Sequence, residues 1–263
     1  MKIFYRSSTF MPCAISTLAF FIMVYEKLEA KRGDFVILQS VNQDVMPKVS
    51  GNKKQLTRMV SPASTFKIII SWAGIEEGKV SATTLHRVKD GHVPDTPREI
   101  NLHEAMYYSS NDYFTWLSRK IGEAELATYI RKSNISATEI ADDWLKGKWQ
   151  DAKKGGDLKV NAEAQHRFIK EMMRGQITSS PAVHQQVLKV MEWPSAIKGT
   201  RVFGKTGVWG GAVWFNGFGI KEGQSKAVTV LYEGSIAERH GAIAAFYRQF
   251  EMQPLAPSEG FFE

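Results

Sequence analysis

The sequence contains almost no cysteine and none of the common nucleotide-binding or zinc-binding motifs. Cys13 is the single cysteine among 263 residues, so the chain cannot build a disulfide framework of its own. It has no zinc-finger spacing, Walker loop or Gly-x-Gly-x-x-Gly motif, and it shows no internal repeat or low-complexity segment. The six histidines stand at unrelated positions, none with a carboxylate or cysteine at ligand spacing, so we expect no metal and no metal cofactor.

A concentrated charged tail is also absent, although the chain is basic overall. Lys and Arg number 34 against 27 Asp and Glu, which gives a net charge of +7 spread along the sequence. A diffuse basic surface favours anionic partners such as cell-wall polymer, membrane or nucleic acid without selecting one, and with no motif for it we expect no nucleic acid partner. At 43% hydrophobic residues, the chain is long enough for one large domain or two interleaved subdomains with a substantial core.

The N-terminal sequence has the build of an export signal. Lys2 and Arg6 precede an apolar run over residues 10–25, after which the sequence turns polar. The run is shorter than the roughly 20 apolar residues that a membrane-spanning helix needs, which favours a signal cleaved after Ala30 over an uncleaved anchor. We therefore expect a periplasmic or secreted protein, membrane-anchored if the signal is retained.

The periodicity of apolar residues changes twice along the chain. Residues 1–30 are predicted as signal peptide or N-terminal anchor, and residues 31–263 as one domain that opens with a strand, continues through helices and closes with strands and a helix. The predicted strands are 35–39, 213–220 and 227–232, and the predicted helices are 102–106, 113–121, 124–131, 162–174 and 240–250. This order predicts an α/β (α+β) fold, in which a central antiparallel β-sheet shared by both chain ends is flanked by helices and carries an all-helical subdomain.

Residues around Ser64 favour the start of an apolar helix. Ser61 is a good N-cap, Pro62 suits the first helical position, and apolar residues follow at helical spacing. Ser64 is thereby expected in the first turn, with Lys67 three residues on over the same face. A serine hydroxyl needs a base to take its proton, and a lysine can serve where burial lowers its pKa. Ser64 and Lys67 are candidate nucleophile and base.

Ser-x-x-Lys is a short pattern, and the sequence contains it three times. The copy at 50–53 has turn chemistry, and the copy at 195–198 follows a proline in a polar connection. Only the copy that begins at Ser64 opens a strongly apolar helix, so the functional interpretation applies to that copy and needs partners elsewhere in the chain.

Two later motifs offer such partners. Ser109 could relay a proton between Lys67 and a leaving amine, and the Asn111 amide could bind both Lys67 and a substrate carbonyl. Such Ser, Asn and Asp clusters are also ordinary helix caps.

The second motif is Lys205-Thr206-Gly207, ahead of an aromatic strand. On a sheet edge facing the Ser64 helix, Lys205 would supply positive charge, Thr206 a hydroxyl for a substrate carboxylate, and Gly207 bare backbone for the substrate to lie against. A simple turn between strands would explain Gly207 but not the whole triplet.

The three motifs together are more specific than any one of them, since Ser-x-x-Lys, Ser-x-Asn and Lys-Thr-Gly are the signature of penicillin-interacting serine enzymes. From Phe35 onward the chain resembles the class D, oxacillinase-type serine β-lactamases of the penicillin-binding protein-like superfamily. The resemblance rests on residues 61–68, 204–207, 214–218 and 102–122. It implies acylation of Ser64 by a β-lactam substrate, followed by hydrolysis of the acyl-enzyme.

The resemblance also implies roles for single residues. Ser64 would be the nucleophile and Lys67 the general base, which in this family is carboxylated by carbon dioxide to N6-carboxylysine; no other cofactor is implied. Ser109 would belong to the catalytic set, and the backbone N–H groups of Ser64 and Val208 would form the oxyanion hole.

Arg239 falls where the family places a carboxylate-binding arginine, although a surface ion pair is an alternative. Trp144, with Phe66, resembles the pocket that holds the modified lysine; Trp149 competes for that assignment, and a core tryptophan is the alternative.

The sequence departs from the family at several positions. Asn111 stands where the family has a valine that helps to keep the lysine neutral and carboxylated. The family's Tyr-Gly-Asn element is replaced at 132–134 by Lys-Ser-Asn, and the segment 144–161 is longer than usual. Acylation is therefore better supported than rapid turnover. The alternatives are a penicillin-binding protein or β-lactam sensor domain that turns over slowly and could meet peptidoglycan stem peptides, and a non-catalytic cell-wall-binding domain.

Overall fold

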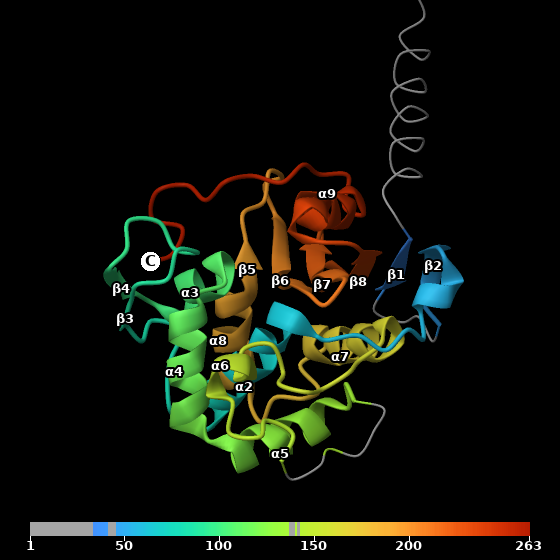
Figure 1. Ribbon diagram of the computed structural model, residues 1–263. Coiled ribbons are helices and arrows are strands. Elements are labelled where there is room, and N and C mark those ends of the chain that lie inside the picture. Colours follow the sequence, from blue (N-terminus) through green and yellow to red (C-terminus); the bar gives the residue numbers. More distant parts are fainter. Residues whose placement is uncertain (1–33, 42–45, 137–139, 141–142) are drawn as a thin grey trace, which may run out of the picture. The chain divides into compact units, whose positions relative to one another are not determined.

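Both ends of the described chain contribute strands to one antiparallel sheet (Figure 1). The computed structural model describes residues 34–41, 46–136, 140 and 143–263, so the signal and the domain boundary predicted near residue 30 lie outside the described residues. The sheet order is β2-β1-β8-β7-β6-β5. The strands are β1 (Phe35–Val41), β2 (Lys48–Gly51), β5 (Glu192–Trp193), β6 (Thr200–Trp209), β7 (Ala212–Lys221) and β8 (Gln224–Glu233).

Helices cover both faces of this sheet and fill the middle of the chain. The helices are α2 (Lys67–Glu76), α3 (Leu102–Tyr108), α4 (Asn111–Ile121), α5 (Glu123–Ser133), α6 (Trp149–Ala152), α7 (Ala162–Met173), α8 (Pro181–Met191) and α9 (Arg239–Arg248). Three 3₁₀ turns are η1 (Lys53–Gln55), η2 (Ala63–Phe66) and η3 (Ile236–Glu238). The predicted fold class, an antiparallel sheet flanked by helices, is confirmed.

The core divides into two clusters because successive strand residues point to opposite faces of the sheet. Val213 and Phe215 of β7 pack against α9, in a cluster with Ala242, Ile243 and Phe246. The alternate residues Ala212, Trp214 and Phe218 join the larger cluster, which contains α2 and most of the helical part. The sheet is therefore buried on both faces, which explains the nearly continuous apolar runs of β7 and β8.

Two expectations about the elements need correction. The helical part is not all-helical, because β3 (His86–Val88) and β4 (Arg98–Ile100) pair in it as a small antiparallel sheet. Helix α8 is absent from the sequence prediction, although Ser180 caps its N-terminus by accepting a hydrogen bond from the Val183 N–H and a proline follows the cap. Within the described ranges, no helix combines the length and hydropathy needed to cross a membrane.

Candidate active site

Ser64 lies in the 3₁₀ turn η2, directly before α2. The expected helix start is therefore wrong in register: Lys67 is the first α-helical residue, and Ser61 does not cap the helix but accepts a hydrogen bond from the Ala63 N–H at 3.1 Å. Ala63 has a φ of 50°, which is unfavourable for a residue with a Cβ. This backbone is held by the indole of Trp214, which donates to the Ser61 carbonyl at 2.9 Å.

Lys67 is fully buried, and its amine contacts the second motif. The Nζ atom lies 2.6 Å from the carbonyl oxygen of Ser109, 2.9 Å from the Ser109 Oγ and 3.1 Å from the Asn111 Oδ1. Burial lowers the pKa of Lys67 well below its usual value, against the opposing charge of Asp90 and with a smaller contribution from Lys153. A lowered pKa favours the neutral amine, which is the form that can accept a proton.

The two serines between α3 and α4 have different roles: Ser110 caps a helix, and Ser109 contacts Lys67. Ser109 has a φ of 63° and ends α3, while Ser110 caps α4 by accepting a hydrogen bond from the Tyr113 N–H at 3.2 Å. The helix-cap alternative therefore holds for Ser110. The side chains of Ser109 and Asn111 point instead to Lys67.

The Lys-Thr-Gly triplet lies on β6, past the point where β5 stops pairing with it. Strand β5 pairs only with Val202 and Phe203, so Lys205 and the residues after it form an open edge of the sheet. A Cβ on Gly207 would stand 3.1 Å from the Ser64 backbone nitrogen and 3.0 Å from that of Thr65. Glycine at this position therefore allows β6 to approach the turn that carries Ser64.

Lys205, Thr206 and Arg239 form a polar cluster at this edge. The Arg239 Nε donates to the Thr206 Oγ1 at 3.2 Å, and the Lys205 Nζ lies 3.5 Å from the same oxygen. Burial lowers the pKa of Lys205 well below its usual value, and the charges of Lys67 and Arg239 lower it further. Burial also lowers the pKa of Arg239. Among the described residues, no carboxylate lies within ion-pair distance of Lys205 or Arg239, so this cluster is suited to an anionic group from a ligand.

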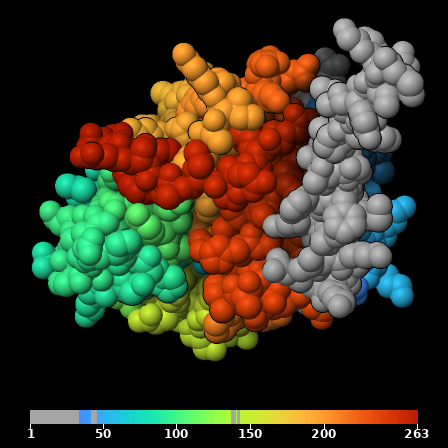
Figure 2. Space-filling view, turned by 90° about the horizontal axis from the view of Figure 1, so that it is seen from above, coloured from blue at the N-terminus to red at the C-terminus, as the bar shows by residue number. Residues whose placement is uncertain are grey.

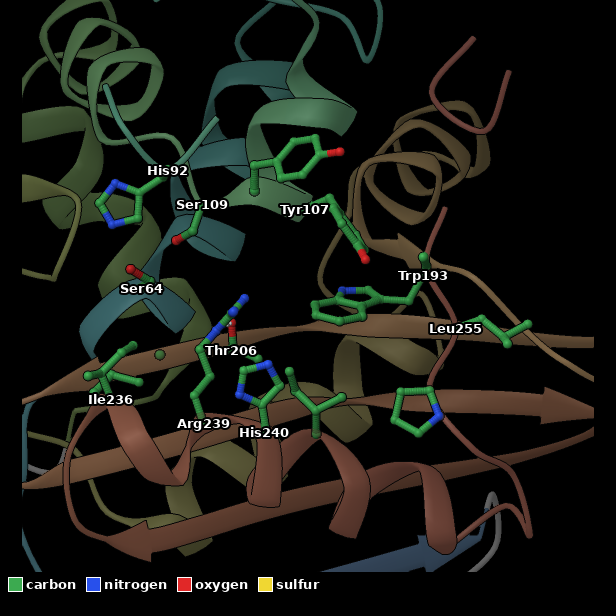
Figure 3. Close-up of a pocket in the computed structure, with 16 residues that line it drawn as sticks. Ser64, His92, Tyr107, Ser109, Trp193, Thr206, Ile236, Arg239, His240 and Leu255 are labelled. Atoms are coloured by element: carbon green, nitrogen blue, oxygen red, sulfur yellow. Dashed lines mark hydrogen bonds between the residues drawn. The ribbon is translucent and has the colours of Figure 1, made fainter. Parts of the chain in front are cut away.

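One cavity of about 570 Å³ connects these groups (Figure 3). Six of the predicted site residues line it, namely Ser64, Ser109, Thr206, Gly207, Val208 and Arg239. Lys67 and Lys205 are fully buried behind this lining. The structure therefore gathers the three motifs, which are separated by up to 141 residues between Ser64 and Lys205, around one space. No hydrogen bond is found between Ser64 Oγ and Lys67 Nζ in the described structure, and catalytic contacts of this kind often form only with substrate bound.

Trp144 lies beside the residue that precedes Lys67. Its ring meets the buried ring of Phe66 edge-on at 5.8 Å between centroids. The Trp144 Nε1 is buried without a hydrogen-bond partner among the described residues. Trp149 is only partly buried at the edge of the core. Of the two tryptophans considered, Trp144 is the one in ring contact with Phe66.

Asp90 is a site residue that the sequence does not reveal, because Asp90-Gly91 is a pattern typical of an ordinary turn. Its carboxylate accepts hydrogen bonds from the Ser110 hydroxyl at 2.6 Å and the Asp112 N–H at 2.9 Å. Burial alone would raise the pKa of Asp90, but hydrogen bonds from His92, Ser110 and the backbone hold it well below its usual range. Asp90 thus remains an anion, and its charge opposes the lowering of the Lys67 pKa.

The cavity wall away from the three motifs was also not predicted. Tyr107, Trp193, Ile243 and residues 254–256 line it. These apolar residues carry no local pattern that separates them from core residues, so only the tertiary structure shows that they face a cavity.

The serine and buried lysine of the first motif, the second serine and the Lys-Thr-Gly edge thus meet around one cavity, and together they are the motif set of penicillin-interacting serine enzymes. The chain belongs to the penicillin binding protein transpeptidase domain family, whose pattern matches residues 27–209. Relatives and structural neighbours of the chain include class D β-lactamases, which bears out the resemblance found in the sequence. They support a class D-like serine β-lactamase as the type of enzyme.

Three similar proteins illustrate the range of this relationship. The regulatory protein BlaR1 of Bacillus licheniformis is 30% identical over 105 residues, which cover 38% of this chain and only 18% of BlaR1. β-Lactamase OXA-10 of Pseudomonas aeruginosa is 24% identical over 210 residues, covering 74% of this chain and 73% of OXA-10. The solved structure of the BPu1 β-lactamase matches the fold with a TM-score of 0.74 at 19% identity, over 88% of this chain and 97% of that one.

Proposed function

We propose that this protein is a serine β-lactamase that opens the β-lactam amide through an acyl-enzyme on Ser64. The observation that carries the proposal is the buried Lys67 amine, held 2.9 Å from the Ser109 hydroxyl, behind a cavity lined by Ser64, Ser109 and the Lys-Thr-Gly edge. The relationship to OXA-10 and to the family of transpeptidase domains supports the same class of substrate.

In the acylation step, the Ser64 Oγ attacks the carbonyl carbon of the β-lactam. The neutral Lys67 amine accepts the hydroxyl proton, directly or through the Ser109 hydroxyl. The bond between the carbonyl carbon and the ring nitrogen then breaks, and the nitrogen takes a proton back from Lys67 through Ser109. Water hydrolyses the resulting ester and restores the Ser64 hydroxyl.

Two groups of the substrate need binding partners: its carboxylate, and the carbonyl oxygen that becomes negatively charged during the reaction. We assign its carboxylate to Thr206, Lys205 and Arg239, which offer a hydroxyl, an amine and a guanidinium as hydrogen-bond donors without a competing protein carboxylate. The backbone N–H groups of Ser64 and Val208 are assigned to the oxyanion, a role that the close packing of β6 on the Ser64 turn at Gly207 supports. A preorganised donor of this kind contributes about 3 kcal/mol to transition-state stabilisation.

The surroundings of Lys67 fit a plain amine better than a carboxylated one. Two oxygens that can only accept, the Ser109 carbonyl at 2.6 Å and the Asn111 Oδ1 at 3.1 Å, contact its Nζ, and they would repel the oxygens of an anionic carbamate on that nitrogen. The unpartnered Trp144 Nε1 is a donor that would favour a carbamate. Because the acceptors touch the nitrogen itself, we assign Lys67 as the plain amine and derive no step through carbon dioxide.

The proposal is tested by intact mass and turnover together. With a penicillin, the chain should gain the mass of one β-lactam and then lose it, and a chromogenic cephalosporin should be hydrolysed continuously. The control Ser64→Ala should show neither the adduct nor turnover. One equivalent of stable adduct would support instead a penicillin-binding or sensor-like domain, which the comparisons do not favour. No adduct together with no turnover would contradict both and leave the non-catalytic cell-wall-binding domain.

A further inference from the structure

Residues 252–263, here called the strap, follow α9, and three of them contribute to the lining of the cavity. In Figure 1 the strap runs from α9 toward the end of the sheet formed by β3 and β4, and Figure 2 shows it as red atoms on the surface that reach the green helical part. No backbone hydrogen bond fixes residues 253–257 to another segment of the described structure. The strap is thus tethered at its ends and free of the main sheet.

Both ends of the strap are anchored. At its start, the Met252 N–H donates to the Tyr247 carbonyl at 3.2 Å, and its buried side chain contacts the Ser195 hydroxyl. At its far end, the Phe262 carbonyl accepts a hydrogen bond from the Asn101 side chain at 2.6 Å. The rings of Phe261 and Phe262 pack on His103, with centroids 5.0 and 5.2 Å away. The path between these anchors is therefore defined by specific contacts.

The middle of the strap faces the cavity with apolar side chains. Pro254, Leu255 and Ala256 all line it, next to Trp193 and Tyr107, whose rings are 4.8 Å apart. Leu255 is 47% exposed, which is unusual for a leucine. Trp193 is buried, so the wall combines an exposed leucine with a buried aromatic ring, and an apolar lining of this kind is typical of the part of a site that holds an apolar ligand group.

This wall lies beyond the carboxylate-binding cluster. In Figure 3, Thr206 and Arg239 stand between Ser64 on one side and Trp193 with Leu255 on the other. In a bicyclic β-lactam, the carboxylate is carried by the ring fused to the lactam. A substituent next to that carboxylate extends past it, away from the reacting carbonyl. With the lactam at Ser64 and the carboxylate at Arg239, such a substituent would reach the wall.

We propose that Leu255, with Trp193 and Tyr107, forms an apolar subsite for the substituent beside the carboxylate of the substrate, and that the strap thereby sets substrate preference. The inference rests on the proposed β-lactamase function. The preferred substrates are cephalosporins with an aryl group at the carbon next to the one that carries the carboxylate. Contact of this group with the strap stabilises both the bound substrate and the acylation transition state.

The test compares two cephalosporins with the same acyl side chain, one with a methyl and one with a styryl group at that carbon. Wild-type protein should acylate faster with the styryl compound, and Leu255→Asp should lower the ratio of the styryl to the methyl second-order acylation rate by about tenfold, whatever smaller loss the new charge causes for both. Leu85→Asp is the matched control, because Leu85 is 58% exposed and does not line the cavity; it should change neither rate. Equal losses for both compounds, or no loss, would overturn the subsite.

A binding measurement keeps the two proposals separable. If neither compound acylates the protein, the proposed function fails, and the subsite is judged by calorimetry with 4-phenylbutyrate against acetate. The subsite requires that wild-type protein bind phenylbutyrate more tightly and that Leu255→Asp remove this difference while Leu85→Asp keeps it. Equal affinity of wild-type protein for the two carboxylates, or a difference that survives Leu255→Asp, refutes it.

Discussion

At the scale of single residues, three basic side chains meet beside a serine. Burial is the main cause that lowers the pKa of Lys67, Lys205 and Arg239, and at Lys205 the charges of the other two lower it further. The negative charge of Asp90 raises the pKa of Lys67 and so opposes the effect of burial there. The protonation of Lys67 is therefore set by a balance between burial and one nearby anion. Because Lys67 must be neutral to act as the proposed base, the acylation rate should rise as pH rises through its lowered pKa.

Replacing Asp90 tests this balance. Asp90→Asn removes the charge that raises the pKa of Lys67, so the pKa should fall and the midpoint of the pH–acylation profile should move to lower pH. The profile is measured as the adduct-formation rate at a fixed, sub-saturating concentration of one penicillin. Ser110→Ala is the control, since it removes a hydrogen bond to the same carboxylate but leaves the charge, and its midpoint should stay close to that of the wild type. A midpoint that moves upward in Asp90→Asn would contradict the assignment of Lys67 as the base.

The same scale shows what the sequence could not reveal about the site. Ser64, Lys67 and the Lys-Thr-Gly triplet can be found from the sequence, because their residues are close together in the chain. Each motif also stands next to a helix or strand that the sequence predicts. Asp90 acts through space from a loop that has only ordinary turn residues. Its partners Ser110 and Asp112 belong to the next helix start, and no spacing rule connects them to Lys67.

At the scale of elements, helix α7 is joined to the sheet through a buried histidine. His166 lies 2.9 Å from the Ser40 hydroxyl of β1 and 3.3 Å from the Thr229 hydroxyl of β8. Burial, with a smaller effect of Lys170, lowers the pKa of His166 to about 4 from its usual 6.5. The folded protein therefore keeps this ring neutral at pH values where the unfolded chain has already protonated it.

This linkage predicts acid sensitivity with a definite sign. The histidine's contribution to stability is complete above about pH 6.5 and is lost as pH falls toward about 4, where the loss approaches its limit of about 3 kcal/mol. Urea unfolding at a series of pH values should show this decrease in the wild type and a smaller one in His166→Gln. His240→Gln, at an exposed position, should keep the wild-type decrease. An equal decrease in His166→Gln would assign the acid sensitivity to other groups.

Elements with a simple period were predictable, and those defined by the tertiary structure were not. Strands β7 and β8 and helix α7 follow from runs of apolar residues. The 3₁₀ turn at Ser64 does not, because the packing of Gly207 and the hydrogen bond from Trp214 fix it from β6 and β7. Helix α8 begins with a capping serine and a proline, but polar residues around them make this helix start resemble a loop in the sequence.

At the scale of the whole molecule, we propose export by the N-terminal signal to the periplasm or medium, which the basic start and apolar run of the sequence support. Expressed in a bacterium with an outer membrane, the full chain should yield a processed protein whose intact mass begins at Lys31. The same chain begun at Lys31 should stay in the cytoplasm. A full-length mass in the membrane fraction would indicate a retained anchor, and one in the cytoplasm would contradict export.

The pairing of β1 with β8 has a consequence for how the protein is made. Phe35 pairs with Tyr232, and Val41 with Lys226, so a strand synthesised first waits for one that emerges almost 200 residues later. Until β8 has been synthesised, β1 lacks the strand that joins it to β7, and the apolar faces of the growing sheet have no complete partner. The nascent chain therefore cannot complete its sheet for nearly the whole of its synthesis, which suits the proposed export, and the cavity gains Arg239 only once translation has passed that residue.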